Sequence, residues 1–150
     1  SGVMIFALSP NAQRHLGLQF EKRQTKKTYV ARVWGQIEAD SGTVDLPLIV
    51  DWENRPKQMI CHNTGRAALT DWQVINRDRG ETRVKLSPKT GRSHQLRVHM
   101  LALGHPILGD PFYGTPESQA APRLMLHSHR LRLRHPDGGE VMDFRAKQPF

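Results

Sequence analysis

The sequence of 150 residues lacks the features that mark several large classes of protein. It has one cysteine, Cys61, which excludes an internal disulfide framework and is typical of a reducing compartment such as the cytoplasm. No stretch resembles a secretory signal peptide or an apolar membrane span of about 18 residues. No glycine-rich phosphate-binding loop is present either. These absences favour a cytoplasmic protein that is not anchored in a membrane.

Acidic residues are scarce relative to basic ones. The chain has 22 Lys and Arg against 14 Asp and Glu, which gives a formal net charge of +8 and a pI near 10.3. This excess favours a polyanionic partner, with nucleic acid ahead of a membrane surface because no segment is a basic amphipathic anchor. The alternative is a solvated basic surface that has no partner.

Hydrophobic periodicity and turn residues predict one domain with an α+β fold. Ser9 and Pro10 are suited to open a helix over residues 11–22, as its N-cap and its first helical position. Residues 27–34 alternate as a strand, with Tyr29 and Ala31 on one face. We therefore expect a mixed, mainly antiparallel sheet with flanking helices. The other expected strands cover residues 2–8, 42–50, 57–62, 69–75, 82–86, 131–134 and 141–145, the last four pairing as two hairpins.

A second helix, expected over residues 93–103, carries an arginine in an apolar setting. Met100 and Leu101 share the side of Arg97, and apolar residues cover much of the remaining circumference, so the helix should be buried. A permanently charged guanidinium in that position needs a carboxylate or phosphate partner. The alternative is that the aliphatic part of the Arg97 side chain is buried while its guanidinium reaches the surface. Position alone does not identify the acid.

The eight histidines do not form a pattern typical of a metal site. His94 and His99 are five residues apart, so a helix does not bring them onto one face. His127 and His129 could share a strand face, but no thiolate or carboxylate accompanies them. We expect no metal.

Two further features each have two interpretations. Tyr29 follows Lys26 and Lys27, so its ring is either part of the core or a platform on which a base stacks. Residues 54–58, which include Arg55 and Lys57, form a basic loop that is either a phosphate contact or a solvated turn.

Several segments resemble the RluA family of RNA pseudouridine synthases, and together they span essentially the whole chain. They are Lys-Thr-Tyr-Val-Ala at 27–31, Gly-Arg-Ser-His-Gln-Leu-Arg-Val-His at 91–99, Gly-His-Pro-Ile at 104–107, Gly-Asp at 109–110, Arg-Leu-Met-Leu-His at 123–127 and His-Pro at 135–136. The loop at 54–58 further resembles the dual-specificity branch, which modifies 23S rRNA and the anticodon stem-loop of some tRNAs. The resemblance implies a pseudouridine synthase catalytic-domain fold and structured RNA as the partner.

The resemblance also implies a reaction and roles for residues. The N1–C1′ bond of uridine breaks, the uracil turns, and C5 bonds to C1′ without a metal or redox cofactor. By resemblance, Arg97 orients and charges a nucleophilic aspartate, while Tyr29 stacks on the uracil and takes part in removing the C5 proton. RNA binding is assigned to Lys26, Lys27, Arg55, Lys57, Arg92, His94 and Gln95.

One departure from the family pattern concerns the nucleophile. The family's aspartate lies in His-Arg-Leu-Asp-x-x-Thr-Ser-Gly, of which Ser1-Gly2-Val3 matches only the end. We therefore expect residues 1–150 to be a catalytic domain that lacks its N-terminal part, is inactive alone, and is monomeric. The partner of Arg97 would then be the aspartate upstream of Ser1. The alternative function is a non-catalytic basic module that binds RNA.

Overall fold

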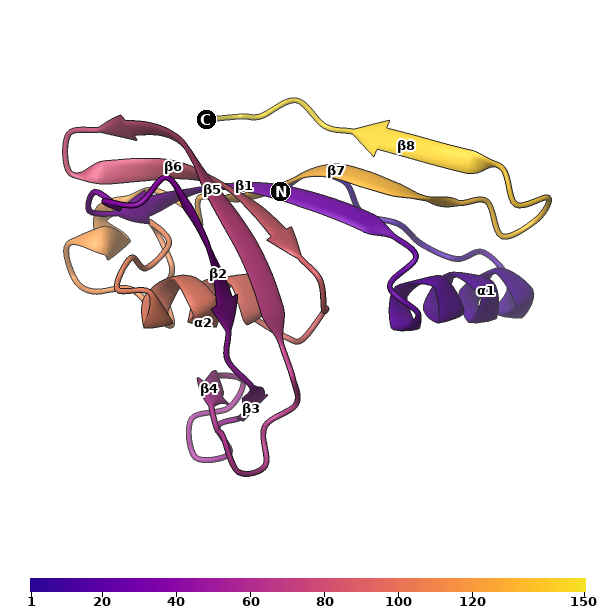
Figure 1. Ribbon diagram of the computed structural model, residues 1–150, viewed down its shortest axis with the longest axis horizontal. Helices are drawn as coiled ribbons and strands as arrows, with labels where there is room; N and C mark the ends of the chain where they lie inside the picture. Colours follow the sequence, from indigo (N-terminus) through magenta and orange to yellow (C-terminus); the bar gives the residue numbers. More distant parts are fainter.

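The structure, a computed structural model that describes residues 1–150, is built on one long antiparallel sheet (Figure 1). A separate two-stranded sheet, β3 (Leu48–Val50) and β4 (Gln58–Ile60), extends from one side of the molecule. The ladders between named strands are all antiparallel, which confirms the predicted fold class. In spatial order, the strands of the main sheet are β2 (Ser41–Asp45), β5 (Leu69–Asp78), β6 (Glu81–Pro88), β1 (Lys26–Trp34), β7 (Leu126–Arg134) and β8 (Val141–Arg145).

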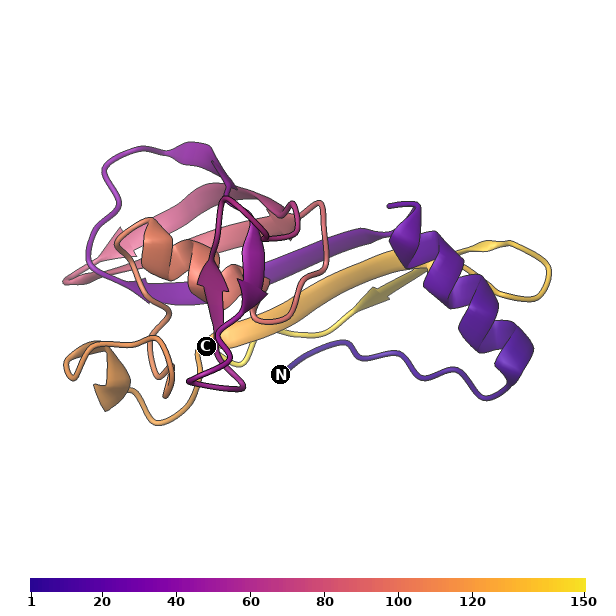
Figure 2. The ribbon, with the colours of Figure 1, turned by 90° about the horizontal axis from the view of Figure 1, so that it is seen from below.

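Two α-helices lie on the same face of the main sheet (Figures 1 and 2). Helix α1 (Pro10–Glu21) begins as predicted, because the Ser9 side chain caps it by accepting a hydrogen bond from the Ala12 N–H. Helix α2 (Gln95–Ala102) lies beneath the wider part of the sheet, and a short 3-10 turn, η1 (Ser118–Ala120), follows it. Neither α-helix has the length and apolar character needed to cross a membrane.

The main core fills the space between the sheet and α2. Its fully buried members include Val33 from β1, Val84 and Leu86 from β6, and Met100 from α2. At roughly 1.5–3 kcal/mol for each large apolar side chain removed from water, this core fixes α2 against β1.

Helix α2 is buried as predicted, but it is shorter than residues 93–103. His94 has a φ of 53°, a left-handed conformation that prevents an earlier start. The polar side chains of Gln95 and His99 are also buried, whereas Leu101 is exposed, contrary to the expectation that it shares the buried side. Both ring nitrogens of His99 are used in the core: Nε2 donates a hydrogen bond to the Leu46 carbonyl, and Nδ1 accepts one from the Thr70 hydroxyl. Its role is structural.

Two expected strands are wrong. Residues 2–8 form only a single parallel bridge, between Gly2 and Ser128, because β8 occupies the edge of β7 from Arg130 onward. The range 42–50 is divided between two sheets, since Pro47 has no N–H with which to continue a ladder. The hairpins at 69–86 and 126–145 form as expected, with longer strands.

Candidate functional site

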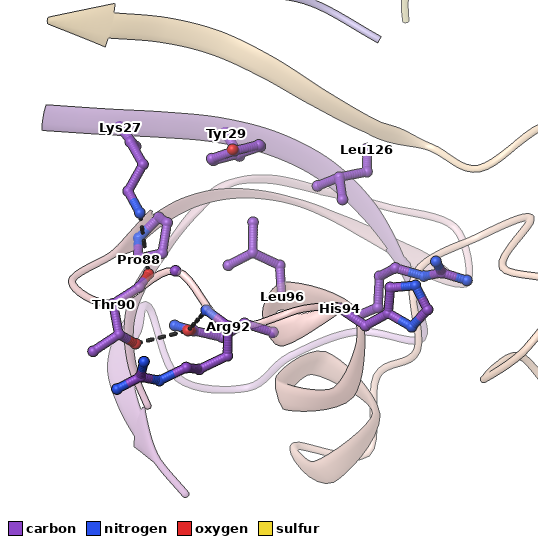
Figure 3. Close-up of a pocket in the computed structure, with 11 residues that line it drawn as sticks. Lys27, Tyr29, Pro88, Thr90, Arg92, His94, Leu96 and Leu126 are labelled. Carbon is purple, nitrogen blue, oxygen red and sulfur yellow. Dashed lines mark hydrogen bonds between the residues drawn. The ribbon is translucent and has the colours of Figure 1, made fainter. Parts of the chain in front are cut away.

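A pocket of about 240 Å³ opens between β1 and the start of α2 (Figure 3). Figure 3 shows Tyr29 and Leu126 on the sheet side of this pocket, facing Leu96 and His94 from the helix side. The wall therefore combines an aromatic face with basic and amide groups. Its lining residues are Lys27, Tyr29, Pro88, Thr90, Gly91, Arg92, His94, Gln95, Leu96, Arg97 and Leu126.

The strand β1 supplies Lys27 and Tyr29 to the pocket, at alternate positions of the chain. The pairing of β1 with β7 shifts register between Thr28 and Tyr29, an irregularity that can re-aim a side chain. Tyr29 is half-buried and packs against the main core, yet it also lines the pocket. The two interpretations of this tyrosine are thus compatible in the structure.

Lys27 lines the pocket as a cation without an acidic partner. Its Nζ donates a hydrogen bond to the Thr90 carbonyl at 3.1 Å and forms no salt bridge. Burial lowers the pKa of Lys27 below its ordinary value, because desolvation disfavours the charged form. An anion in the pocket would therefore stabilise this ammonium.

Gln95 holds the loop that precedes α2 in place. Its Oε1 accepts hydrogen bonds from the Thr90 hydroxyl at 2.7 Å and the Arg92 N–H at 3.0 Å. Its Nε2 donates to the Leu69 carbonyl and the Thr70 hydroxyl, both at 3.0 Å. The side chain is buried and used within the protein, so the structure gives Gln95 a loop-shaping role at the pocket wall.

Arg97 is held by Asp110 in a two-point ion pair. Its Nε and Nη2 donate to the two carboxylate oxygens at 2.8 and 2.7 Å, and the side chains are 13 % and 0 % exposed. The guanidinium also lies 5.1 Å from the ring centres of both Phe112 and Tyr113. Within residues 1–150, the acid that pairs with Arg97 is therefore Asp110, a partner that the sequence analysis did not name. The Nη1 atom forms no hydrogen bond within the chain.

Asp110 is itself fixed by the backbone around it. The N–H groups of Phe112 and Tyr113 donate to its carboxylate at 2.9 and 3.2 Å. Gly109 has a φ of 75°, and a Cβ at that position would lie 1.8 Å from the Arg123 carbonyl oxygen, so only glycine fits there. Burial by itself raises the pKa of Asp110, but the Arg97 and backbone hydrogen bonds outweigh it and hold that pKa below its ordinary value.

His94 connects the pocket to the Gly109–Tyr113 turn. Its Nδ1 lies 2.7 Å from the Tyr113 hydroxyl oxygen, which accepts a hydrogen bond from the Gln58 N–H at 2.8 Å. Burial, followed by the nearby charge of Arg97, lowers the pKa of His94 and favours a neutral ring. A neutral ring whose Nδ1 accepts a hydrogen bond from the Tyr113 hydroxyl carries its own N–H at Nε2. We assign that tautomer to His94.

The structure does not bring every predicted RNA contact into the pocket. Lys26 is exposed at the start of β1, and Arg55 and Lys57 lie in the loop between β3 and β4. The Arg55 guanidinium stacks over the ring of Trp52, 4.8 Å from its centre. A hydrogen bond from the Gln58 N–H, at the start of β4, to the Tyr113 hydroxyl links this two-stranded sheet to the site.

Sequence reasoning missed the role of several residues around the pocket. Asp110 belongs to the Gly-Asp pair already recognised as a family element, and its place shortly after the helix of Arg97 was an available signal. Arg23 and Arg66 lie near Arg92 only because the chain folds, so no local pattern marks them.

Comparison with known proteins is consistent with this architecture. A family model described as RNA pseudouridylate synthase matches residues 1–102. The dual-specificity RNA pseudouridine synthase RluA of Yersinia pestis is 59 % identical over 152 aligned residues, which cover 100 % of this chain and 74 % of the relative. The protein of the same name from Escherichia coli K12 is 56 % identical, with 100 % and 69 % covered.

Solved structures of human proteins share the fold. Human RNA pseudouridylate synthase domain containing 1 superposes with a TM-score of 0.81 at 32 % identity, covering 96 % of this chain and 63 % of that one. Human RNA pseudouridylate synthase domain containing 4 gives 0.78 at 26 % identity, covering 97 % and 66 %. The chain thus spans about two thirds of each solved structure. The family match, the whole-chain identity and the shared fold establish that this chain belongs to the RNA pseudouridine synthase family.

Proposed function

We propose that this chain is the larger part of an RNA pseudouridine synthase that converts uridine to pseudouridine in structured RNA. The observation that carries the proposal is that Tyr29, from β1, and Arg97, from α2, line the same pocket. Residues at the family's catalytic positions, distant in sequence, thus meet at one cavity in a basic protein. The enzyme acts as a cytoplasmic monomer and needs neither metal nor cofactor.

The reaction requires a base removed from its stack and a nucleophile beneath its sugar. In balanced form, the N1–C1′ bond breaks, C5 bonds to C1′, and the proton on C5 leaves while N1 gains one. Unstacking costs a few kcal/mol, which contacts with the flipped nucleotide must offset. Tyr29 offers a ring face for stacking, and such contacts contribute about 1–3 kcal/mol per base.

The nucleophilic aspartate is proposed to enter this pocket from the residues that precede Ser1. No His-Arg-Leu-Asp motif occurs within residues 1–150. The Ser1 nitrogen donates to the carbonyl of Leu126 at 3.2 Å, and Leu126 lines the pocket. Ser1 therefore lies beside the cavity edge. Arg97, fixed by Asp110, offers its free Nη1 to that carboxylate and favours its charged form.

The family branch suggests the substrates. The relatives from Yersinia pestis and Escherichia coli are named dual-specificity enzymes. We accordingly propose 23S rRNA and the anticodon stem-loop of tRNA as substrates of the intact protein. Lys26, Lys27, Arg55, Lys57, Arg92 and His94 would contact the RNA, while Gln95 shapes the loop that presents Arg92.

Tritium release from RNA containing 5-³H-uridine tests the proposal. We expect turnover by a protein that includes the upstream Arg-Leu-Asp segment, and none by residues 1–150 alone. The matched control is the extended protein with that aspartate changed to asparagine, which should be inactive while still binding RNA. Turnover by the 150-residue chain would show that its nucleophile lies elsewhere.

The second candidate is a non-catalytic module that binds RNA. The net charge of +8 favours it. RNA binding by the extended protein without tritium release on any rRNA or tRNA stem-loop would support this candidate over the enzyme.

A further inference from the structure

A second hollow, of about 620 Å³, adjoins the pocket. The two share Lys27, Tyr29 and the Thr90–Arg92 segment, so a ligand could extend from one into the other. The hollow also receives side chains from three segments that are far apart in the chain. Its lining residues are Phe20, Glu21, Arg23, Lys27, Tyr29, Arg66, Thr90, Gly91 and Arg92.

Three arginines of this hollow, Arg23, Arg66 and Arg92, have no acidic partner, and we call them the arginine cluster. None forms a salt bridge, and Glu21, the one acid in the lining, forms none either. The only side-chain hydrogen bond in the cluster runs from the Arg92 Nε to the Ala67 carbonyl at 2.9 Å. Most of the donors in this cluster are therefore free.

The cluster concentrates positive charge at some energetic cost. Burial, followed by the charges of Arg66 and Arg23, lowers the pKa of Arg92. Arg32, by contrast, is neutralised by a two-point ion pair with Glu81. A bound anion would relieve the repulsion within the cluster.

Local backbone structure fixes each member of the cluster. Arg23 follows α1 with a φ of 56°, an uncommon left-handed conformation for a residue other than glycine. The backbone of Arg66 pairs with Leu48, with N–H···O distances of 2.8 and 2.9 Å in the two directions. The Arg92 N–H is bound by Gln95. The three arginines are thus carried by three separate segments of ordered backbone.

We propose that the arginine cluster is a subsite for the RNA backbone, binding a phosphodiester group beside the nucleotide whose base occupies the Tyr29 pocket. The inference rests on the proposed function and extends it to residues outside the family motifs. Guanidinium groups match the phosphate geometry with paired N–H donors. Because Lys27 and Tyr29 line both hollows, one nucleotide can place its base in the first and its phosphate in the second.

Salt-dependent RNA binding by the full-length protein tests the subsite. Arg23→Gln and Arg66→Gln are compared with Arg79→Gln, which removes the same charge from the exposed turn between β5 and β6. For each cluster variant, the slope of log affinity against log salt should shrink by about 0.7–0.9, and Kd near 0.1 M salt should rise about fivefold. Arg79→Gln should leave both close to the wild-type values. Arg66→Lys should restore the slope, since an ammonium still neutralises a phosphate.

The outcomes separate this inference from the proposed function. If the wild-type protein forms pseudouridine but the cluster variants behave like Arg79→Gln, the subsite is wrong and the enzyme assignment stands. If the wild-type protein forms none but only the cluster variants show the smaller salt slope, the subsite is supported and the enzyme assignment fails. Circular dichroism of each variant confirms that the comparison is made between folded proteins.

Discussion

The site has two ends, one at Arg97 and one at the arginine cluster, and they differ in whether a carboxylate neutralises the positive charge. At the Arg97 end, Asp110 neutralises the guanidinium, two aromatic rings enclose it, and almost no surface is exposed. At the other end, Arg23, Arg66 and Arg92 have no carboxylate partner and line an open hollow.

The two ends are therefore suited to different tasks. The Arg97 end can hold a charge in a fixed orientation, whereas the arginine cluster can attract an anion. A buried two-point ion pair cannot rotate freely, so Arg97 can present one remaining donor in a fixed direction. Unpaired arginines beside solvent gain most of their interaction energy from the ligand itself, and that gain depends on salt. We therefore expect substitutions at the first end to change catalysis and stability, and those at the second to change RNA affinity.

The largest effect is expected from Arg97→Lys in the extended protein. A single ammonium cannot bridge both oxygens of Asp110 and also reach the pocket, so kcat should fall by about 100-fold or more. The Kd for RNA should change little, because the charge is kept. Tritium release under saturating RNA measures the first quantity, and fluorescence anisotropy the second. Near-normal turnover by a folded variant would show that Arg97 is only a structural side chain.

Asp110→Asn should give the next largest effect, on stability. It leaves the buried Arg97 charge uncompensated, which should lower the free energy of unfolding by about 3 kcal/mol. Glu81→Gln is the matched control, because it breaks the two-point pair with Arg32, where both side chains are about a quarter exposed. That pair should contribute about 1 kcal/mol or less. Urea unfolding compares the two, and equal losses would contradict the distinction between the ends.

The pH dependence of stability sharpens the same comparison. Because the pKa of Asp110 is lower in the folded state, its ion pair stabilises the protein fully above the ordinary carboxyl value of about 4. The contribution is lost as the pH falls from there through the folded-state pKa. Wild-type unfolding free energy should therefore drop more steeply below about pH 4 than that of Asp110→Asn. Parallel curves from urea titrations would indicate that Asp110 has an ordinary pKa.

The smallest effect is expected from Arg55→Gln, in the loop between β3 and β4. Arg55 stacks on Trp52 and lies outside both hollows, so its loss should raise the Kd for RNA by less than about threefold. Arg23→Gln, measured in the same salt series, provides the comparison. A larger loss for Arg55→Gln would move the main RNA contact from the arginine cluster to this loop.

Local patterns in the sequence were sufficient for much of the fold. The Ser9-Pro10 pair predicted the start of α1, and the alternation at 27–34 predicted β1. Residues 2–8 were misassigned because a strand needs a free edge as well as an apolar pattern, and β8 already occupies that of β7. A sequence shows propensity directly, whereas the availability of a pairing edge depends on the rest of the sheet.

The sequence by itself determined the family motifs, the basic character of the protein and the need of Arg97 for an acid, because each depends on residue type and short-range spacing. Only the tertiary structure decided which acid that is. Asp110 meets Arg97 because Gly109 permits a turn against the backbone of Arg123, a contact between separate segments. The arginine cluster likewise exists only because α1, the Arg66 bridge and the Arg92 loop meet beside Tyr29. Charge is a property of composition, but its orientation and pairing are set by packing.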